Sequence, residues 1–122
     1  MSGLYVSRSQ RKEVGGTNMD CGCKTATTKL FIEGEYGADP VWCSVCQYNI
    51  ELDELPIDDG LMSELLAWGN SYGQWVDLEA GIYVDGGEAM EAAHNKEGAL
   101  LAKKLQMALK GVTVTFNPSA MA

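Results

Sequence analysis

Four cysteines in two closely spaced pairs constrain the fold of this chain more than any other feature. The first pair is Cys21 and Cys23, and the second pair is Cys43 and Cys46. Two pairs of thiolates at such spacing supply the four sulfur ligands of a closed tetrahedral zinc site, which has no open position for a substrate. The sequence therefore predicts one structural Zn²⁺ ion bound by Cys21, Cys23, Cys43 and Cys46. Iron remains an alternative, because rubredoxin-like sites use the same four-sulfur geometry.

The second pair, Cys43 and Cys46, also fits a redox-active dithiol. Such a dithiol needs a helix N-terminus that lowers the pKa of one thiol, whereas residues typical of strands surround this motif. Met1–Asp20 contains no apolar segment of the kind found in secretory signals. We therefore expect a cytoplasmic protein in a reducing compartment, where disulfides are uncommon. These observations favour a metal site over a redox centre.

Two segments beside the cysteine pairs have the composition of β-strands. Thr28–Glu33 is rich in strand-forming residues. Gln47–Asp53 alternates polar and apolar residues, which is typical of a strand with one solvent-facing side. Gly37 and Pro40 indicate a turn between these two segments. The order of cysteine pair, strand, cysteine pair and strand predicts a zinc ribbon over residues 20–56.

The segment after the ribbon predicts an α-helix. Asp58 or Asp59 can cap its start, where a carboxylate also complements the positive end of the helix dipole. Gly69 and Gly73 weaken the helix, so its end is expected between Gly69 and Val76. Apolar residues recur at steps of four and three along this segment and form one stripe, which consists of Leu61, Leu65, Trp68, Tyr72 and Trp75.

A second helix and a strand complete the predicted elements. Asp85 and Glu88 fit a capping box at the start of a helix that runs from about Gly87 to Lys110. A short extended linker over residues 77–84 is expected between the two helices. Val112–Phe116 is rich in strand-forming residues and can pair with a strand of the ribbon.

Together these segments predict an α+β fold, in which an N-terminal zinc-ribbon-like β unit is followed by two helices and a C-terminal strand. The expected domain organisation is a flexible arm over residues 1–19 and a single zinc-stabilised domain over residues 20–122. The helical part of this domain, with the terminal strand, is expected over residues 57–122. A chain of 122 residues buries roughly two-thirds of its unfolded surface, which is enough for one core.

Charge is distributed unevenly along the chain, whose formal net charge is −8. No lysine or arginine occurs between Leu30 and Asn95, while this stretch contains most of the acidic residues. Such a surface repels phosphate groups and attracts basic surfaces, although surface charge also serves solubility alone. We therefore expect a protein partner with a basic surface. We expect no membrane interaction, because no apolar run approaches the ~20 residues of a membrane span.

Two groups of residues are candidates for contact with this partner. One group is the aromatic stripe of Trp68, Tyr72 and Trp75, because tryptophan and tyrosine are favoured anchors at protein interfaces; at helical spacing such a stripe also fits the core. The other group is the carboxylates around the start of the first helix: Glu51, Asp53, Glu54, Asp58 and Asp59.

His94, the only histidine, has no partner at a catalytic spacing and is expected at the helix surface or at its boundary with the core.

Three segments of the chain carry a resemblance to a known group of proteins. These segments are Glu33–Cys43, Ser44–Cys46 and Gly73–Asp77. They resemble segments of small, uncharacterised zinc-ribbon proteins of Bacillus-type bacteria and their phages, which have the cysteine pattern CxC…CxxC. The resemblance covers about residues 20–119. It implies a cytoplasmic zinc-ribbon protein in a phage or prophage setting, and it implies no particular activity.

The leading functional hypothesis is a small acidic, zinc-binding interaction or regulatory protein that binds another protein through its acidic face. One alternative is an enzyme of unknown reaction, but the sequence contains no nucleophile–base pair, phosphate-binding loop or open metal site, so we expect no enzymatic activity. The other alternative is a nucleic-acid-binding zinc ribbon, which would use the basic residues near the two ends of the chain: Arg8, Arg11, Lys12, Lys24, Lys29, Lys96, Lys103, Lys104 and Lys110.

Overall fold

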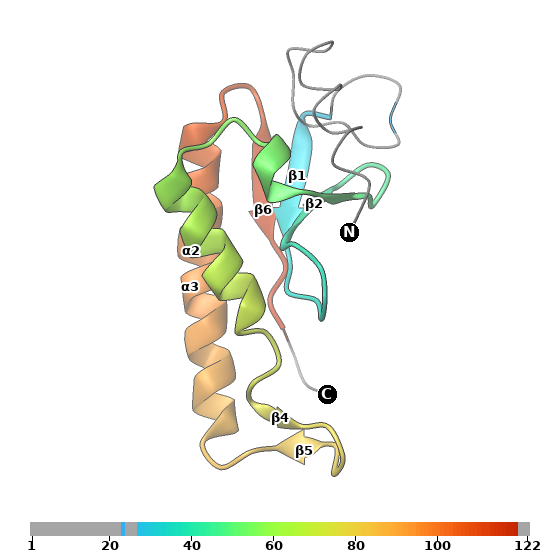
Figure 1. Ribbon diagram of the computed structural model, residues 1–122, viewed down its shortest axis with the longest axis vertical. Coiled ribbons are helices and arrows are strands. Elements are labelled where there is room, and N and C mark those ends of the chain that lie inside the picture. Colours follow the sequence, from blue (N-terminus) through green and yellow to red (C-terminus); the bar gives the residue numbers. More distant parts are fainter. Residues whose placement is uncertain (1–22, 24–26, 120–122) are drawn as a thin grey trace.

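The computed structural model describes Cys23 and residues 27–119, and it has the mixed α+β architecture that the sequence predicts (Figure 1). The predicted arm over residues 1–19 and the predicted ligand Cys21 lie outside the described residues. The elements in chain order are β1 (Lys29–Ile32), β2 (Val41–Cys43), β3 (Asn49–Ile50), the 3₁₀-helix η1 (Leu52–Glu54), α2 (Asp59–Asn70), β4 (Val76–Asp77), β5 (Ile82–Tyr83), α3 (Gly87–Ala108) and β6 (Thr113–Phe116).

The two halves of the chain share one sheet, in which β1 is an inner strand. The strand order is β3-β2-β1-β6. β2 runs antiparallel to β1, with Leu30 opposite Cys43. β6 runs parallel to β1, with Leu30 opposite Val114, so the expected pairing of the terminal strand with a ribbon strand is confirmed. Parallel strands need a long crossover connection, and both helices lie in the connection from β1 to β6.

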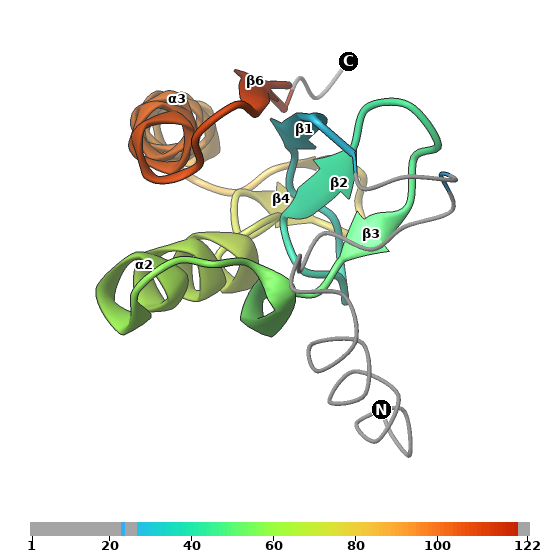
Figure 2. The ribbon, with the colours of Figure 1, turned by 90° about the horizontal axis from the view of Figure 1, so that it is seen from above.

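Helices α2 and α3 pack side by side against one face of this sheet (Figures 1 and 2). The buried residues of α2 are Leu61, Leu65 and Trp68, which belong to the predicted stripe. Truncation of one buried leucine to alanine costs about 2–5 kcal/mol. Neither described helix is long and apolar enough to cross a membrane. The centre of the core is aliphatic and consists of Leu30, Ile32, Ile50, Leu65, Leu101 and Leu105.

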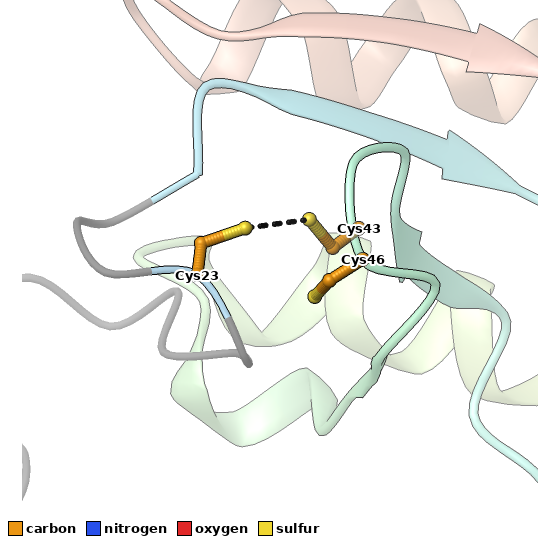
Figure 3. Close-up of side chains that lie close together, drawn as sticks. All are labelled: Cys23, Cys43 and Cys46. Atoms are coloured by element: carbon orange, nitrogen blue, oxygen red, sulfur yellow. Dashed lines mark hydrogen bonds between the residues drawn. The ribbon is translucent and has the colours of Figure 1, made fainter.

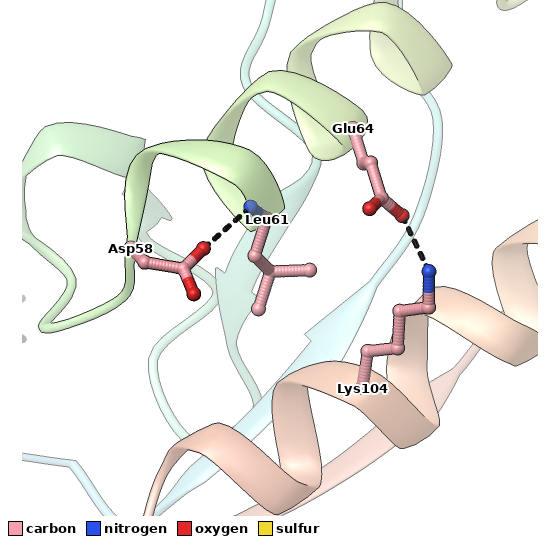
Figure 4. Close-up of polar contacts among 4 residues, drawn as sticks. All are labelled: Asp58, Leu61, Glu64 and Lys104. Carbon is pink, nitrogen blue, oxygen red and sulfur yellow. Dashed lines mark hydrogen bonds and ion pairs between the residues drawn. The ribbon is translucent and has the colours of Figure 1, made fainter.

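The two helices begin in different ways. Asp58 caps α2 as expected, because its Oδ1 accepts a hydrogen bond from the backbone N–H of Leu61 at 2.8 Å (Figure 4). The predicted capping box of α3 is wrong, since Gly86 occupies the N-cap with a φ of +73° and provides no side-chain hydrogen bond. A glycine adopts this left-handed backbone without steric cost, so the chain can turn sharply into α3.

The segment between the helices is a β-hairpin and not the expected linker. β4 pairs antiparallel with β5. The carboxylate of Asp77 accepts hydrogen bonds from the backbone N–H groups of Glu79 (3.0 Å) and Ala80 (3.2 Å), and this fixes the turn. Strands of two residues are too short to show an alternating pattern, so the sequence contains no strong signal for this hairpin. The segment Gln47–Asp53, which was predicted as one strand, instead contains the short strand β3 and the start of the 3₁₀-helix η1.

Candidate functional site

Three cysteines meet at the end of the sheet formed by β1 and β2 (Figure 3). The sulfur atoms of Cys23, Cys43 and Cys46 all lie within 4.8 Å of one another, and those of Cys23 and Cys43 are 3.8 Å apart. Cys43 is buried, whereas Cys46 is exposed. The backbone N–H of Val45 donates a hydrogen bond to the sulfur of Cys43 at 3.4 Å. The turn that contains Cys43 and Cys46 therefore brings both sulfurs toward Cys23.

The geometry of these thiols fits a metal ion. With zinc–sulfur bonds of about 2.3 Å, tetrahedral ligands lie roughly 3.8 Å apart, which matches the separation of the Cys23 and Cys43 sulfurs. A disulfide between the two would need a sulfur–sulfur distance of about 2.0 Å. Thiolates are also the ligands that zinc and iron–sulfur centres prefer. The three clustered cysteines can therefore bind a metal.

The acidic residues predicted to contact a partner have different environments. Asp53, Asp58 and Asp59 are exposed, Glu51 is half-buried, and Glu54 is buried with a relative exposure of 2%. Asp58 is also engaged as the cap of α2. A partner that docks on this face can reach the carboxylates of Asp53, Asp58 and Asp59 more readily than those of Glu51 and Glu54.

The aromatic stripe is mostly interior. Trp68 and Trp75 are almost fully buried, with relative exposures of 2% and 3%, and Tyr72 is half-buried. The indole N–H of Trp68 donates to the backbone carbonyl of His94 at 2.8 Å, which connects α2 to α3. Tyr72 contacts both Tyr36 and Trp75 in edge-to-face arrangements. The two tryptophans thus hold the helices together, and only Tyr72 is available at the surface.

His94 is buried in an aromatic cluster that the sequence did not indicate. Its imidazole stacks on Trp68, with ring centroids 4.1 Å apart, and lies 4.7 Å from the ring of Trp75. Nε2 lies 3.0 Å from the carbonyl oxygen of Trp68. A carbonyl only accepts hydrogen bonds, so Nε2 carries the proton. Burial lowers the pKa of His94 below its usual value, although the Trp68 hydrogen bond opposes this effect. The neutral form of the imidazole therefore predominates at pH 7.

A cavity of about 180 Å³ lies beside this cluster. The residues that line it come from four parts of the chain, and single-sequence patterns give no reason to group them. Polar contacts between these parts fix its walls. Asn95 accepts from the backbone N–H of Ser119 and donates to its carbonyl, both at 2.9 Å. The described residues that line it are Glu33, Gly34, Trp68, Tyr72, His94, Asn95, Asn117, Pro118 and Ser119.

A carboxylate connects the end of the chain to the β4–β5 hairpin near this cavity. Glu91, on α3, accepts a hydrogen bond from the hydroxyl of Tyr83 at 2.6 Å and another from the hydroxyl of Ser119 at 2.7 Å. The Glu91 hydrogen bond raises the pKa of Tyr83 to about 12. The hairpin, α3 and the segment after β6 are therefore held in a fixed arrangement at this end of the molecule.

Comparison with known proteins identifies the family. Residues 28–119 match the family model described as Serratia CdiI immunity protein-like. The match covers more than half of the chain and includes every described helix and strand, so the chain belongs to this family. A search of curated proteins finds no match to the chain.

This finding corrects two interpretations of the sequence. The resemblance to zinc-ribbon proteins of Bacillus-type bacteria and phages is wrong, and so is the function inferred as a zinc-binding interaction or regulatory protein. Both depended strongly on the cysteine pairs, but the family match begins at residue 28, after Cys21 and Cys23. The expected binding to a protein partner agrees with the family. CdiI immunity proteins are non-enzymatic toxin inhibitors, so the expectation that the chain is not an enzyme is confirmed.

Proposed function

We propose that this chain is an immunity protein that binds a cognate CdiA toxin domain in the cytoplasm and neutralises it. The observation that carries this proposal is the family match over residues 28–119. The matched residues include all of the described sheet and both described helices, so the proposal concerns the whole fold and not one motif. Inhibition by binding needs a preformed surface and no reactive group.

The charge of the chain supports a toxin domain with a basic surface. The net charge is −8, and residues between Leu30 and Asn95 include no lysine or arginine. Opposite charges on two partners accelerate their association and make its rate depend on ionic strength. The exposed carboxylates of Asp53, Asp58 and Asp59 are the predicted contact residues that such a surface can reach. We therefore expect the association rate to fall as the salt concentration rises.

The direct test is neutralisation of the toxin. Cells that produce the cognate CdiA toxin domain should grow only when this chain is produced with it, and a toxin domain of a different CdiA type serves as the control. The purified pair should also form a complex in calorimetry and size-exclusion chromatography. Growth arrest despite soluble production of the chain, together with no complex at micromolar concentrations, would contradict the proposal.

We further propose that Cys23, Cys43 and Cys46 bind one structural Zn²⁺ ion, with Cys21 as the fourth ligand. The proposal is supported by the sulfur separations and by the N–H of Val45 that donates to Cys43. Zinc bound by four thiolates has no open position and supplies no chemistry beyond cross-linking. Here it would fix the turn after β2 to the residues that precede β1.

Metal analysis of the purified chain tests the zinc proposal. Elemental mass spectrometry should find about one zinc per chain and little iron. Cys46→Ser should lose most of the zinc, whereas Ser44→Ala in the same turn should retain it. A wild-type chain that is folded, has reduced thiols and binds no zinc when zinc is supplied would show that the cysteines are not a metal site.

A further inference from the structure

The cavity beside Trp68 is large enough to hold one side chain of another protein. Its volume of about 180 Å³ far exceeds the ~30 Å³ of one water molecule. It is smaller than the roughly 300–1,000 Å³ of pockets that bind drug-sized ligands. Asn117 and Pro118, which line it, are exposed, so a group from another molecule can enter past them. These dimensions suit one long side chain of a partner protein.

The polar lining of the cavity is rich in hydrogen-bond acceptors. The carboxylate of Glu33 accepts from the side-chain amide of Asn117 through Oε1 at 3.0 Å. Its second oxygen has no hydrogen-bond partner in the described part of the chain. Among the described residues that line the cavity, none is a lysine or an arginine. A negatively charged acceptor without a cation in the same cavity is complementary to a positively charged donor.

The electrostatic environment of Tyr72 is consistent with a negative potential in this cavity. The pKa of Tyr72 is raised above its usual value, first by burial and then by neighbouring acidic groups, which are Tyr36, Glu35, Glu33 and Glu91. The aromatic ring of Tyr72 also lines the cavity. A cation near an aromatic ring gains attraction from the negative face of the ring. The same wall therefore offers both charge and an aromatic surface.

The walls of the cavity are fixed before any partner binds. The Tyr72 ring packs directly against the backbone at Gly34, where an added Cβ would overlap it. Asn95 holds the backbone of Ser119 through two hydrogen bonds. A preformed site avoids much of the cost of ordering side chains on binding.

We propose that this cavity receives a lysine or arginine side chain of the toxin domain, with the Glu33 carboxylate as its counter-ion and Tyr72 as an aromatic wall. This inference rests on the proposed immunity function and identifies one anchor of that interface. Charged pairs and aromatic side chains that a partner covers can contribute more to affinity than charges at the exposed rim of an interface. The cavity would then contribute more to affinity than the exposed carboxylates around α2.

A small cation tests the cavity without the toxin. Ethylguanidinium chloride imitates an arginine side chain, and ethylurea is a neutral compound of similar shape. His94, the only histidine, lines the cavity, so its imidazole proton signals in NMR spectra report on occupancy. Ethylguanidinium should shift these signals saturably at millimolar concentrations, and Glu33→Gln should abolish the shift. Equal shifts with ethylurea or sodium chloride, or a shift that survives Glu33→Gln, would overturn the inference.

Toxin binding provides the second arm of the test. Glu33→Gln keeps an acceptor for Asn117 but removes the charge, and it should weaken the complex about tenfold or more and reduce its salt dependence. Asp59→Asn, a matched loss of one exposed carboxylate, should change affinity by about twofold at most. If the wild-type chain binds the toxin domain and the Glu33→Gln variant binds it with the same affinity, the cavity inference is overturned but the proposed function is not. No complex with the wild-type chain overturns the proposed function itself.

Discussion

The cysteine cluster (Cys23, Cys43 and Cys46) and the cavity beside Trp68 are two polar sites built in opposite ways. In the cysteine cluster, Cys43 and Cys46 lie on one short turn, and the spacing of the cysteines is visible in the sequence. The cavity instead brings together residues that are far apart, such as Glu33 and Asn117, which are 84 positions apart. The cysteine cluster joins one local pair to Cys23, which is 20 positions from Cys43, whereas the cavity depends on the packing of the whole α+β fold.

The contrast shows that a conspicuous motif and the functional surface need not coincide. The family match includes Cys43 and Cys46 but begins after Cys23, whereas the described residues that line the cavity all lie within residues 28–119. A closed thiolate site would stabilise the fold. A recognition site needs an accessible, chemically distinct surface. Stability and recognition should therefore respond to different substitutions.

Metal removal should have the largest effect, and the effect should be local. Structural zinc contributes about 10–16 kcal/mol to the folding of small zinc-finger peptides at neutral pH. If the cysteine cluster binds zinc, a chelator should raise the amide hydrogen-exchange rates of β2 and β3. Amides in the middle of α3 should remain protected, because α3 packs mainly on β6 and α2, which contain none of the three cysteines. If the amides of α3 and β2 lose protection to the same degree, the cysteine cluster and α3 do not unfold independently.

Truncation of Trp68 should have the next largest effect, and it should be global. Trp68→Ala removes a buried indole, its stacking on His94 and a hydrogen bond between helices. We expect a loss of about 3–5 kcal/mol in the free energy of unfolding, measured by urea denaturation. This is a large fraction of the roughly 5–15 kcal/mol that stabilises a typical domain.

Trp42→Ala is the matched control for this truncation. Trp42 is only half-buried and stacks on Phe31 at the surface of the sheet, with ring centroids 6.2 Å apart. The control variant should therefore lose less stability than Trp68→Ala. If the two variants lose the same free energy of unfolding, the contacts of Trp68 with His94 do not contribute unusually strongly to the packing of the helices.

Acidification should destabilise the fold through His94. The pKa of His94 is lower in the folded state than its unfolded value of about 6.5, so the unfolded chain binds the proton more readily. Its contribution to stability is therefore complete above pH 6.5 and is lost as the pH falls from 6.5 through the lower pKa of the folded state. Urea denaturation at pH 7.5, 6.5 and 5.5 measures this loss.

His94→Gln separates the histidine from other titrating groups. Glutamine retains a side-chain N–H that can donate toward the carbonyl of Trp68, but it does not titrate. The variant should lose part of the pH dependence between pH 7.5 and 5.5, whatever its overall stability. A pH dependence identical to that of the wild-type chain would mean that other groups cause the acid effect.

Features that depend on residues close together in the sequence were predicted better than features that depend on residues far apart. The start of α2 was predictable, because its cap Asp58 and its apolar stripe lie close together in the sequence. Cys43 and Cys46 are recognisable as a pair for the same reason, whereas the approach of Cys23, 20 positions from Cys43, depends on the fold. The β4–β5 hairpin was missed, because two-residue strands have no periodicity and its turn depends on hydrogen bonds to Asp77.

The buried state of His94 and the cavity could not be predicted from one sequence. A histidine on a helix has no local signal that tells whether another helix will cover it. Burial of His94 requires Trp68 on α2 to lie beside it, 26 positions away. The cavity additionally requires the segment after β6 to return past α3, where Asn95 fixes Ser119. Only the three-dimensional packing supplies these relations.

The smallest expected effect comes from an exposed ion pair between α2 and α3. Lys104 Nζ lies 2.7 Å from Glu64 Oε1 (Figure 4), but both side chains are about half exposed. Exposed ion pairs contribute about 0.2–1 kcal/mol, and salt screens them. A double-mutant cycle with Glu64→Gln and Lys104→Met should give a coupling energy in this range, and it should decrease in 1 M sodium chloride. A coupling energy above about 2 kcal/mol would instead place this pair beside Trp68 among the contacts that hold α2 to α3.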